Sequence, residues 1–142
     1  MEIISYFMRK GKEYFFPEID VKILKRALKI LTKKEKETFM EMDEYDRMHS
    51  LEVYKKVCKT EIKNDILYLK LALLHDCGKG KTPILLRSMH KFGVKTRLTE
   101  HPLKGYEKVR NYNEELALLI KNHHRRSYSE KMDIFQKCDD ES

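Results

Sequence analysis

The sequence has few of the residues that build disulfide-stapled, membrane-spanning or loop-rich proteins. Its 142 residues include only 3 Cys, 3 Pro and 5 Gly, with no Trp. Cys58, Cys77 and Cys138 are odd in number and lack CxxC spacing, which argues against a disulfide framework and against a cysteine zinc cluster. No apolar run is long enough for a signal peptide or a membrane span, so we expect a cytoplasmic protein that does not enter a membrane.

Charged residues are abundant in this chain. They make up 37% of it against 41% hydrophobic residues, a balance that suits amphipathic helices with solvated outer faces. The formal net charge of +7 would attract phosphates or nucleic acid. However, Lys33, Lys34 and Lys36 alternate with Glu35 and Glu37, as on an ordinary solvated helix face. No groove-reading motif is present, so binding of a specific nucleic acid is disfavoured.

The length favours one domain with a single core. Apolar residues recur at helical spacing, and no strand pattern of comparable strength occurs, so we expect an all-α, compact, single-domain helical bundle spanning residues 1–142. In this prediction, N-terminal helices within residues 1–45 pack on a core formed by residues 46–142.

Capping residues indicate where several helices begin. Thr32 with Glu35, and Ser127 with Glu130, have the form of capping boxes, and Pro102 suits a first helical turn. We predict helices over, or including, the segments Val21–Leu31, Phe39–Met40, His49–Val57, Ile66–Leu74, Ile84–Met89, Pro102–Val109, Leu116–Ile120 and Met132–Cys138.

The segment from Ile66 to Leu74 is almost continuously apolar. So short a run also fits a buried strand, but Leu and Ala outnumber β-branched residues, and Gly78 stands where a helix C-cap is expected. We therefore predict a central helix that is buried on most of its circumference.

His75 and Asp76 follow this buried helix directly, where an unpaired carboxylate would be costly. A salt bridge or a capping role would explain an isolated His-Asp pair. Five of the six histidines, however, lie in distinctive contexts: His49, His75, His101, His123 and His124. Imidazole and carboxylate together suit divalent cations such as iron, manganese, cobalt, nickel or zinc, with magnesium as a further candidate, and this favours a catalytic metal centre.

Three segments resemble, in order, the motifs of the HD superfamily of metal-dependent phosphohydrolases. DRMHSLEVYKKV supplies His49, LALLHDCGKGK supplies His75 and Asp76, and IFQKCDDES supplies Asp139. HPLKGYEKV and LALLIKNHHRR are similar to the H-P-x-x-G and His-His elements of HD proteins that hold a second metal. The resemblance runs from about Asp46 to the last residue.

The resemblance implies an HD-type helical bundle with one or two divalent ions. A first ion would be held by His49, His75, Asp76 and Asp139. Asp76 would bridge to a second ion held by His101, His123 and His124. Lys79 matches the lysine of the H-D-x-G-K element and is the candidate for a contact with a substrate phosphate, although a lysine near a helix C-terminus also suits the helix dipole.

The implied function is a phosphohydrolase with Asp76 and Lys79 as catalytic residues. Metal-bound hydroxide would attack a phosphate ester of a small molecule, and we expect this substrate to be a nucleotide mono- or diester. The HD-GYP branch has an acidic residue and a Gly-Tyr-Pro element after the His-His pair, whereas this chain has HHRRSYSEKM, so cyclic dinucleotides do not carry over as substrates. The alternative is a catalytically silent, metal-containing module that senses a nucleotide or docks a partner protein. The sequence leaves a homodimer open.

Overall fold

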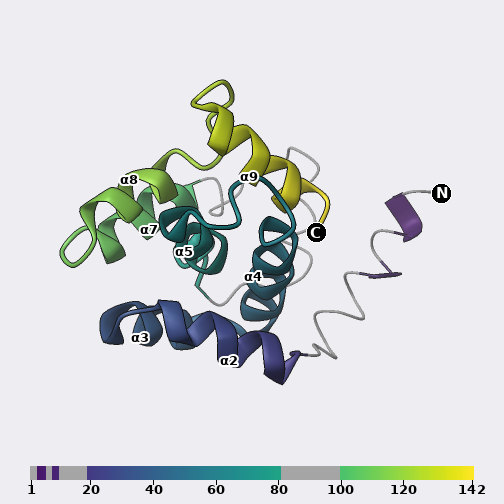
Figure 1. Cartoon of the computed structure of the whole chain (residues 1–142), viewed down its shortest axis with the longest axis horizontal. Coiled ribbons are helices and arrows are strands. Elements are labelled where there is room, and N and C mark those ends of the chain that lie inside the picture. The colour runs from purple at the N-terminus through teal and green to yellow at the C-terminus, as the bar shows by residue number, and fades with distance from the viewer. Residues whose placement is uncertain (1–2, 6–7, 10–18, 81–99) are drawn as a thin grey trace.

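The computed structural model describes residues 3–5, 8–9, 19–80 and 100–142, and these residues form helices joined by turns (Figure 1). No strand is found among them, which confirms the predicted all-α fold. The main helices are α2 (Val21–Ile30), α3 (Lys33–Glu41), α4 (Glu44–Val57), α5 (Ile66–Leu74), α7 (His101–Val109), α8 (Glu114–Lys121) and α9 (Glu130–Asp140). The predicted helix from Ile84 to Met89 lies outside the described residues.

Local sequence explains where α3 begins. Thr32 Oγ1 accepts a hydrogen bond from the Glu35 amide at 3.3 Å, and Glu35 Oε1 accepts one from the Thr32 amide at 2.8 Å. These reciprocal bonds satisfy two amides that have no partner inside the helix, so the predicted capping box is confirmed. Pro102 lies in the first turn of α7, also as predicted.

The capping box predicted at Ser127 and Glu130 is wrong. The N-cap of α9 is Ser129, whose Oγ accepts a hydrogen bond from the Met132 amide at 3.0 Å. Ser127 instead adopts a positive φ of 58° in the preceding turn. The same Ser129 hydroxyl lies 3.3 Å from Tyr68 Oη, so the residue that caps α9 also contacts α5.

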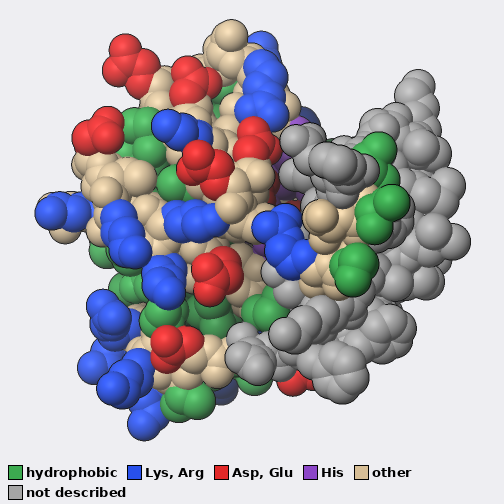
Figure 2. All heavy atoms as spheres, turned by 90° about the vertical axis from the view of Figure 1, so that its right-hand side faces the viewer, with side chains coloured by type: hydrophobic (Ala, Val, Ile, Leu, Met, Phe, Trp, Pro, Cys, Tyr) green, Lys and Arg blue, Asp and Glu red, His purple; other side chains and the backbone are tan. Residues whose placement is uncertain are grey.

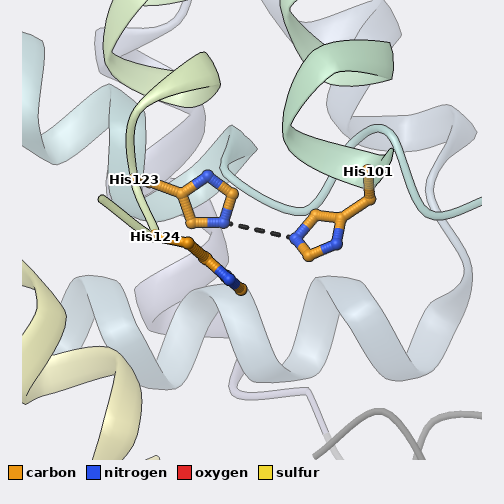
Figure 3. A group of neighbouring side chains, drawn as sticks. All are labelled: His101, His123 and His124. Carbon is orange, nitrogen blue, oxygen red and sulfur yellow. Dashed lines mark hydrogen bonds between the residues drawn. The ribbon is translucent and has the colours of Figure 1, made fainter. Parts of the chain in front are cut away.

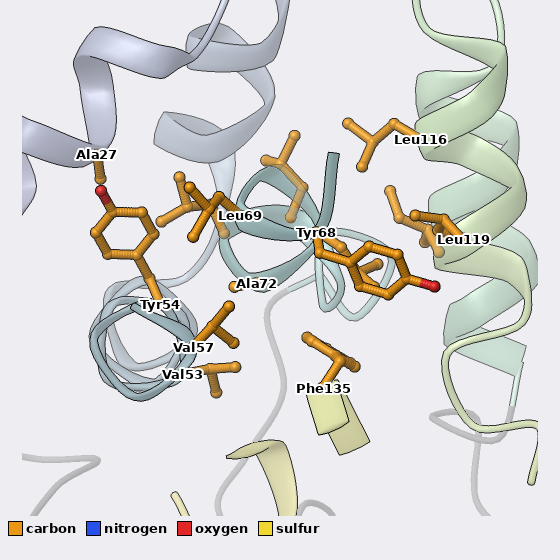
Figure 4. Packing of buried hydrophobic residues seen from close by; sticks show 14 of the residues in the cluster. Ala27, Val53, Tyr54, Val57, Tyr68, Leu69, Ala72, Leu116, Leu119 and Phe135 are labelled. Carbon is orange, nitrogen blue, oxygen red and sulfur yellow. The ribbon is translucent and has the colours of Figure 1, made fainter. Parts of the chain in front are cut away.

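Helix α5 lies at the centre of the bundle, where it contacts α2, α3, α4, α8 and α9. Its residues from Leu71 to Leu74 are fully buried, as the continuously apolar sequence predicts. Figure 4 shows Val53 and Val57 of α4 on one side of α5, Leu116 of α8 on the other, and Phe135 of α9 beneath it. This packing fixes the end of α5, and therefore the two residues that follow it, in the middle of the molecule.

Gly78 does not cap α5, contrary to the prediction. The helix ends at Leu74 with His75 as its C-cap in right-handed helical geometry, and Gly78 lies three residues further on. Within the described part of the chain, the glycine with a positive φ is Gly80, at 66°. The chain after α5 therefore continues through a tight turn, which starts with His75 and Asp76.

The outer surface carries charges of both signs. On the face drawn in Figure 2, Lys and Arg side chains lie among Asp and Glu side chains over the described helices. Among the described residues, no helix combines the length and the apolar character that crossing a membrane requires.

Candidate metal centre

Side chains from five separate segments meet beside the end of α5. His49 comes from α4, His75 and Asp76 from the turn after α5, His101 from the start of α7, His123 and His124 from the turn after α8, and Asp139 from the last turn of α9. The structure thus brings together all the residues that the sequence predicted as metal ligands. Their potential ligand atoms fall into two adjoining groups.

The first group joins α4, the turn after α5 and α9. His49 Nε2 lies 2.9 Å from Asp139 Oδ1 and 3.8 Å from Asp76 Oδ2. His75 Nε2 lies 3.2 Å from Asp76 Oδ2 and 3.3 Å from Asp139 Oδ1. Two imidazole nitrogens and two carboxylate oxygens therefore face one small volume.

The second group joins α7 to the turn after α8 (Figure 3). His101 Nε2 and His123 Nε2 point toward each other at 3.3 Å. His124 offers a third nitrogen, and the ligand atoms of the three histidines lie within 4.8 Å of one another. His101 and His123 are buried, whereas His124 is exposed, so this group opens on the His124 side.

Asp76 lies between the two groups. Its Oδ2 atom faces the first group, whereas its Oδ1 atom is 3.2 Å from His101 Nε2 and 4.0 Å from His123 Nε2. The residue is only 3% exposed. A carboxylate in this position can ligate two cations at once, one through each oxygen.

Backbone carbonyl groups orient two of the rings. His75 Nδ1 donates to the Ala72 carbonyl oxygen at 3.0 Å, and His123 Nδ1 donates to the carbonyl oxygen of Ile120. Because a carbonyl can only accept, the proton of each neutral ring is on Nδ1 and the lone pair is on Nε2. Histidines that ligate a metal are commonly fixed in this way.

His75 Nε2 shows that the residues fit a cation. The nitrogen is fully buried, and among the described residues it has no hydrogen-bond partner. In the neutral ring its lone pair lies close to the Asp76 and Asp139 carboxylate oxygens, so these buried acceptors require a positive charge between them, either a proton on Nε2 or a cation. A divalent cation shared by these atoms can take the place of that proton, and nitrogen with oxygen donors suits the metals expected from the sequence.

The electrostatics of the first group favour positive charge there. Burial opposes a charged His75, but the carboxylates of Asp76 and Asp139 outweigh burial and raise the pKa of His75 well above its usual value. Burial also opposes a charged Asp76, yet His75 and Lys79 hold the pKa of Asp76 well below its usual value. The pKa of Asp139 is likewise lowered, against burial, by His75 and His49. Both carboxylates are therefore ionised at neutral pH, as metal binding requires.

Two histidines of the second group, His123 and His124, are unprotonated at neutral pH. Burial, followed by the neighbouring histidines His124, His75 and His101, lowers the pKa of His123 well below its usual value. Burial and His101 lower the pKa of His124 to about 4. Unprotonated imidazoles are the form that ligates metals.

Cys77 adjoins the centre without offering a thiolate. Burial raises the pKa of this thiol to about 12, and its Sγ atom is 4.0 Å from the Gly105 carbonyl oxygen. The thiol therefore packs against α7, at the contact between that helix and the turn after α5. The candidate ligands in the described part of the chain are thus histidines and aspartates.

Lys79, expected to contact phosphate, pairs with Asp76. Its Nζ atom is 3.3 Å from Asp76 Oδ2, and 16% of its side chain is exposed.

The sequence did not reveal two other residues at the centre. Lys108 donates to the Cys77 carbonyl oxygen at 3.0 Å, and Gln136 donates to the His123 carbonyl oxygen at 3.0 Å. A polar residue on the buried face of α9 is the signal that would have identified Gln136.

A family model described as HD domain matches residues 46–139, a range that contains both groups of candidate ligands. This match confirms the resemblance that the sequence motifs indicated. No match was found among curated proteins or among solved structures.

Proposed function

Because the chain belongs to the HD domain family, we propose that it is a metal-dependent phosphohydrolase acting on a phosphate ester of a small molecule. The substrate class that we propose is a nucleotide mono- or diester. The observation that carries the proposal is the position of Asp76, a buried carboxylate with one oxygen toward each group of histidines.

In this proposal the two groups hold two divalent ions. The first would be held by His49, His75, Asp76 and Asp139, and the second by Asp76, His101, His123 and His124. Ions bound there would lower the pKa of a water molecule and offset negative charge on phosphate oxygens. The protein's part is to fix Asp76 and to hold the rings of His75 and His123 through backbone carbonyls, so that ligands need little reorganisation when the ester is cleaved.

The exposure of the site residues indicates where a substrate would enter. His75, His101 and His123 are buried, whereas His49 and Asp139 keep 14% and 18% of their side chains exposed, and His124 is exposed. A phosphate that approaches past these three partly open residues would also come near Lys79. The lysine ammonium would then form a charge-assisted hydrogen bond with a phosphate oxygen.

The test is to identify the metal bound to the purified chain and to measure phosphate release from a panel of nucleotides with manganese or iron supplied. Asp76→Asn keeps the side-chain shape but removes the negative charge, so we expect it to lose bound metal and activity together. Asp133→Asn is the control, because Asp133 is exposed on α9 and should leave both unchanged.

Two results would contradict the proposal. A folded, metal-loaded protein that binds nucleotides and hydrolyses none would instead favour a nucleotide-sensing module. Affinity for nucleic acid that falls steeply with salt and survives metal removal would favour a role for the basic surface.

A further inference from the structure

Gln136 is a buried side chain of α9 that binds the turn after α8 at three points. Its Nε2 atom donates to the carbonyl oxygens of His123 at 3.0 Å and Arg125 at 2.9 Å. Its Oε1 atom accepts a hydrogen bond from Arg126 Nη1 at 3.0 Å. Both amide hydrogens are used, and the residue is only 4% exposed. One side chain therefore holds most of the turn that carries His123 and His124.

This turn needs external support because it lies beyond the end of α8 at Lys121. Its own backbone bonds run from the His123 amide to the Ile120 carbonyl and from the Arg125 amide to the Asn122 carbonyl. Those bonds leave the carbonyl oxygens of His123 and Arg125 without a partner inside the turn. Gln136 donates a hydrogen bond to each of these carbonyl oxygens. Loss of its amide group would therefore leave a buried acceptor unsatisfied directly behind the His123 ring.

The same helix also serves the first group of ligands. Asp139 lies one helical turn beyond Gln136 and contacts His49 and His75. Phe135, which precedes Gln136, packs edge-on against His75, with ring centroids 5.3 Å apart, and its ring centroid lies 6.4 Å from that of His123. Helix α9 therefore provides a ligand to one group and a support to the other.

We propose that Gln136 is a positioning residue that fixes His123 for the second ion. This inference rests on the proposed two-ion centre. Gln136 acts through the His123 backbone and does not itself ligate an ion. Its loss should therefore weaken binding of the second ion selectively, because the ligands of the first group have other supports.

The experiment is calorimetric titration of the metal-free full chain with Mn²⁺, repeated with Co²⁺ so that the absorption spectrum reports the ligand geometry. Gln136→Met preserves length but removes every hydrogen bond of the amide. We expect the dissociation constant of the second ion to rise roughly 10- to 100-fold, the range found for residues that support metal ligands, while that of the first ion is unchanged. Lys137→Met is the matched control, because Lys137 is exposed on the same helix.

A second variant covers the case in which Gln136→Met does not fold. Gln136→Glu has nearly the same shape and can still accept from Arg126, but it cannot donate to the His123 and Arg125 carbonyl oxygens. It should show the same selective loss. A merely structural role would lower the melting temperature and leave the ratio of the two affinities unchanged, which would overturn the inference.

The outcomes separate this inference from the proposed function. If the unmodified chain binds no second ion, the two-ion centre fails, and the role of Gln136 fails with it. If the unmodified chain binds two ions and the folded Gln136 variants bind both with unchanged affinity, only the inference about Gln136 is overturned.

Discussion

Gly78 lies so close to His101 that a β-carbon on Gly78 would be 2.1 Å from the His101 carbonyl oxygen. The same β-carbon would be 2.5 Å from the Gly105 amide nitrogen. The turn after α5 therefore packs backbone against backbone on the first turns of α7. This contact brings His101 Nε2 to 3.2 Å from Asp76 Oδ1, so the absence of a side chain at Gly78 sets the distance between the second histidine group and its shared carboxylate.

Gly78→Ala should therefore push α7 away from Asp76. We expect the free energy of unfolding to fall by about 1–3 kcal/mol, the usual cost of overpacking, and the affinity for the second ion to fall as well. Urea denaturation and metal titration measure the two effects. Gly105→Ala is the comparison, because its β-carbon would first meet Ile120 Cγ2 of α8, at 2.6 Å, and not the backbone of His101. Equal losses in the two variants would contradict this explanation.

Removal of metal should destabilise the protein. The buried Nε2 atom of His75 lies beside two carboxylate oxygens, so a bound cation stabilises the folded chain and not the unfolded one. At a free metal concentration 100 times the dissociation constant, the stabilisation is about 2.7 kcal/mol. Thermal unfolding with and without a chelator measures this difference. Asp76→Asn should abolish it, whereas an equal chelator effect in that variant would place the stabilising ion elsewhere.

The helices could be predicted because their signals are local. The Thr32–Glu35 capping box depends on atoms three residues apart, and the central position of α5 follows from its continuous apolar sequence. The N-cap of α9 was misplaced because Ser127 and Ser129 are both suitable caps. The structure pairs Ser129 with Tyr68, a residue 61 positions earlier, and no local pattern contains that contact.

For the candidate centre, the order of motifs indicated which residues belong together, and the structure brings them together. Their roles as metal ligands stay predictions. The motifs could not indicate what supports those residues, because support depends on the approach of separate helices. The contact of Gly78 with α7 and the hydrogen bond from Gln136 to His123 are examples, and each depends on how separate segments pack in the fold.

Glu35 should make stability depend on pH in the acid range. Its carboxylate is buried and accepts hydrogen bonds from Asn113 Nδ2 and Lys70 Nζ, each at 2.9 Å, in addition to the Thr32 amide. Burial works to raise the pKa of Glu35, but Asn113, Thr32 and Lys70 outweigh it, so that the pKa lies below its usual value of 4.5. This contribution to stability is therefore present above pH 4.5 and is lost as the pH falls through the lowered folded-state pKa.

The measurement is the free energy of unfolding of the unmodified chain and of Glu35→Gln across the acid range. The advantage of the unmodified chain should be largest near neutral pH and should shrink below pH 4.5. Glu37→Gln on the same helix is the control, because its exposed carboxylate pairs only loosely with Lys34, at 4.0 Å. A difference between the unmodified chain and Glu35→Gln that does not change with pH would mean that the carboxylate charge is not what stabilises this junction.

Replacement of Lys79 separates its two candidate roles. Lys79→Met removes a positive charge that lies 3.3 Å from Asp76 Oδ2, so repulsion of a bound cation decreases and metal affinity should stay equal or increase. If Lys79 also binds the substrate phosphate, hydrolysis should nevertheless fall by about 10²–10³-fold, the usual loss when a group that stabilises developing charge is removed. Lys79→Arg keeps the charge and should retain part of the activity. Activity that instead rises or falls in parallel with metal occupancy would limit Lys79 to balancing the charge of Asp76.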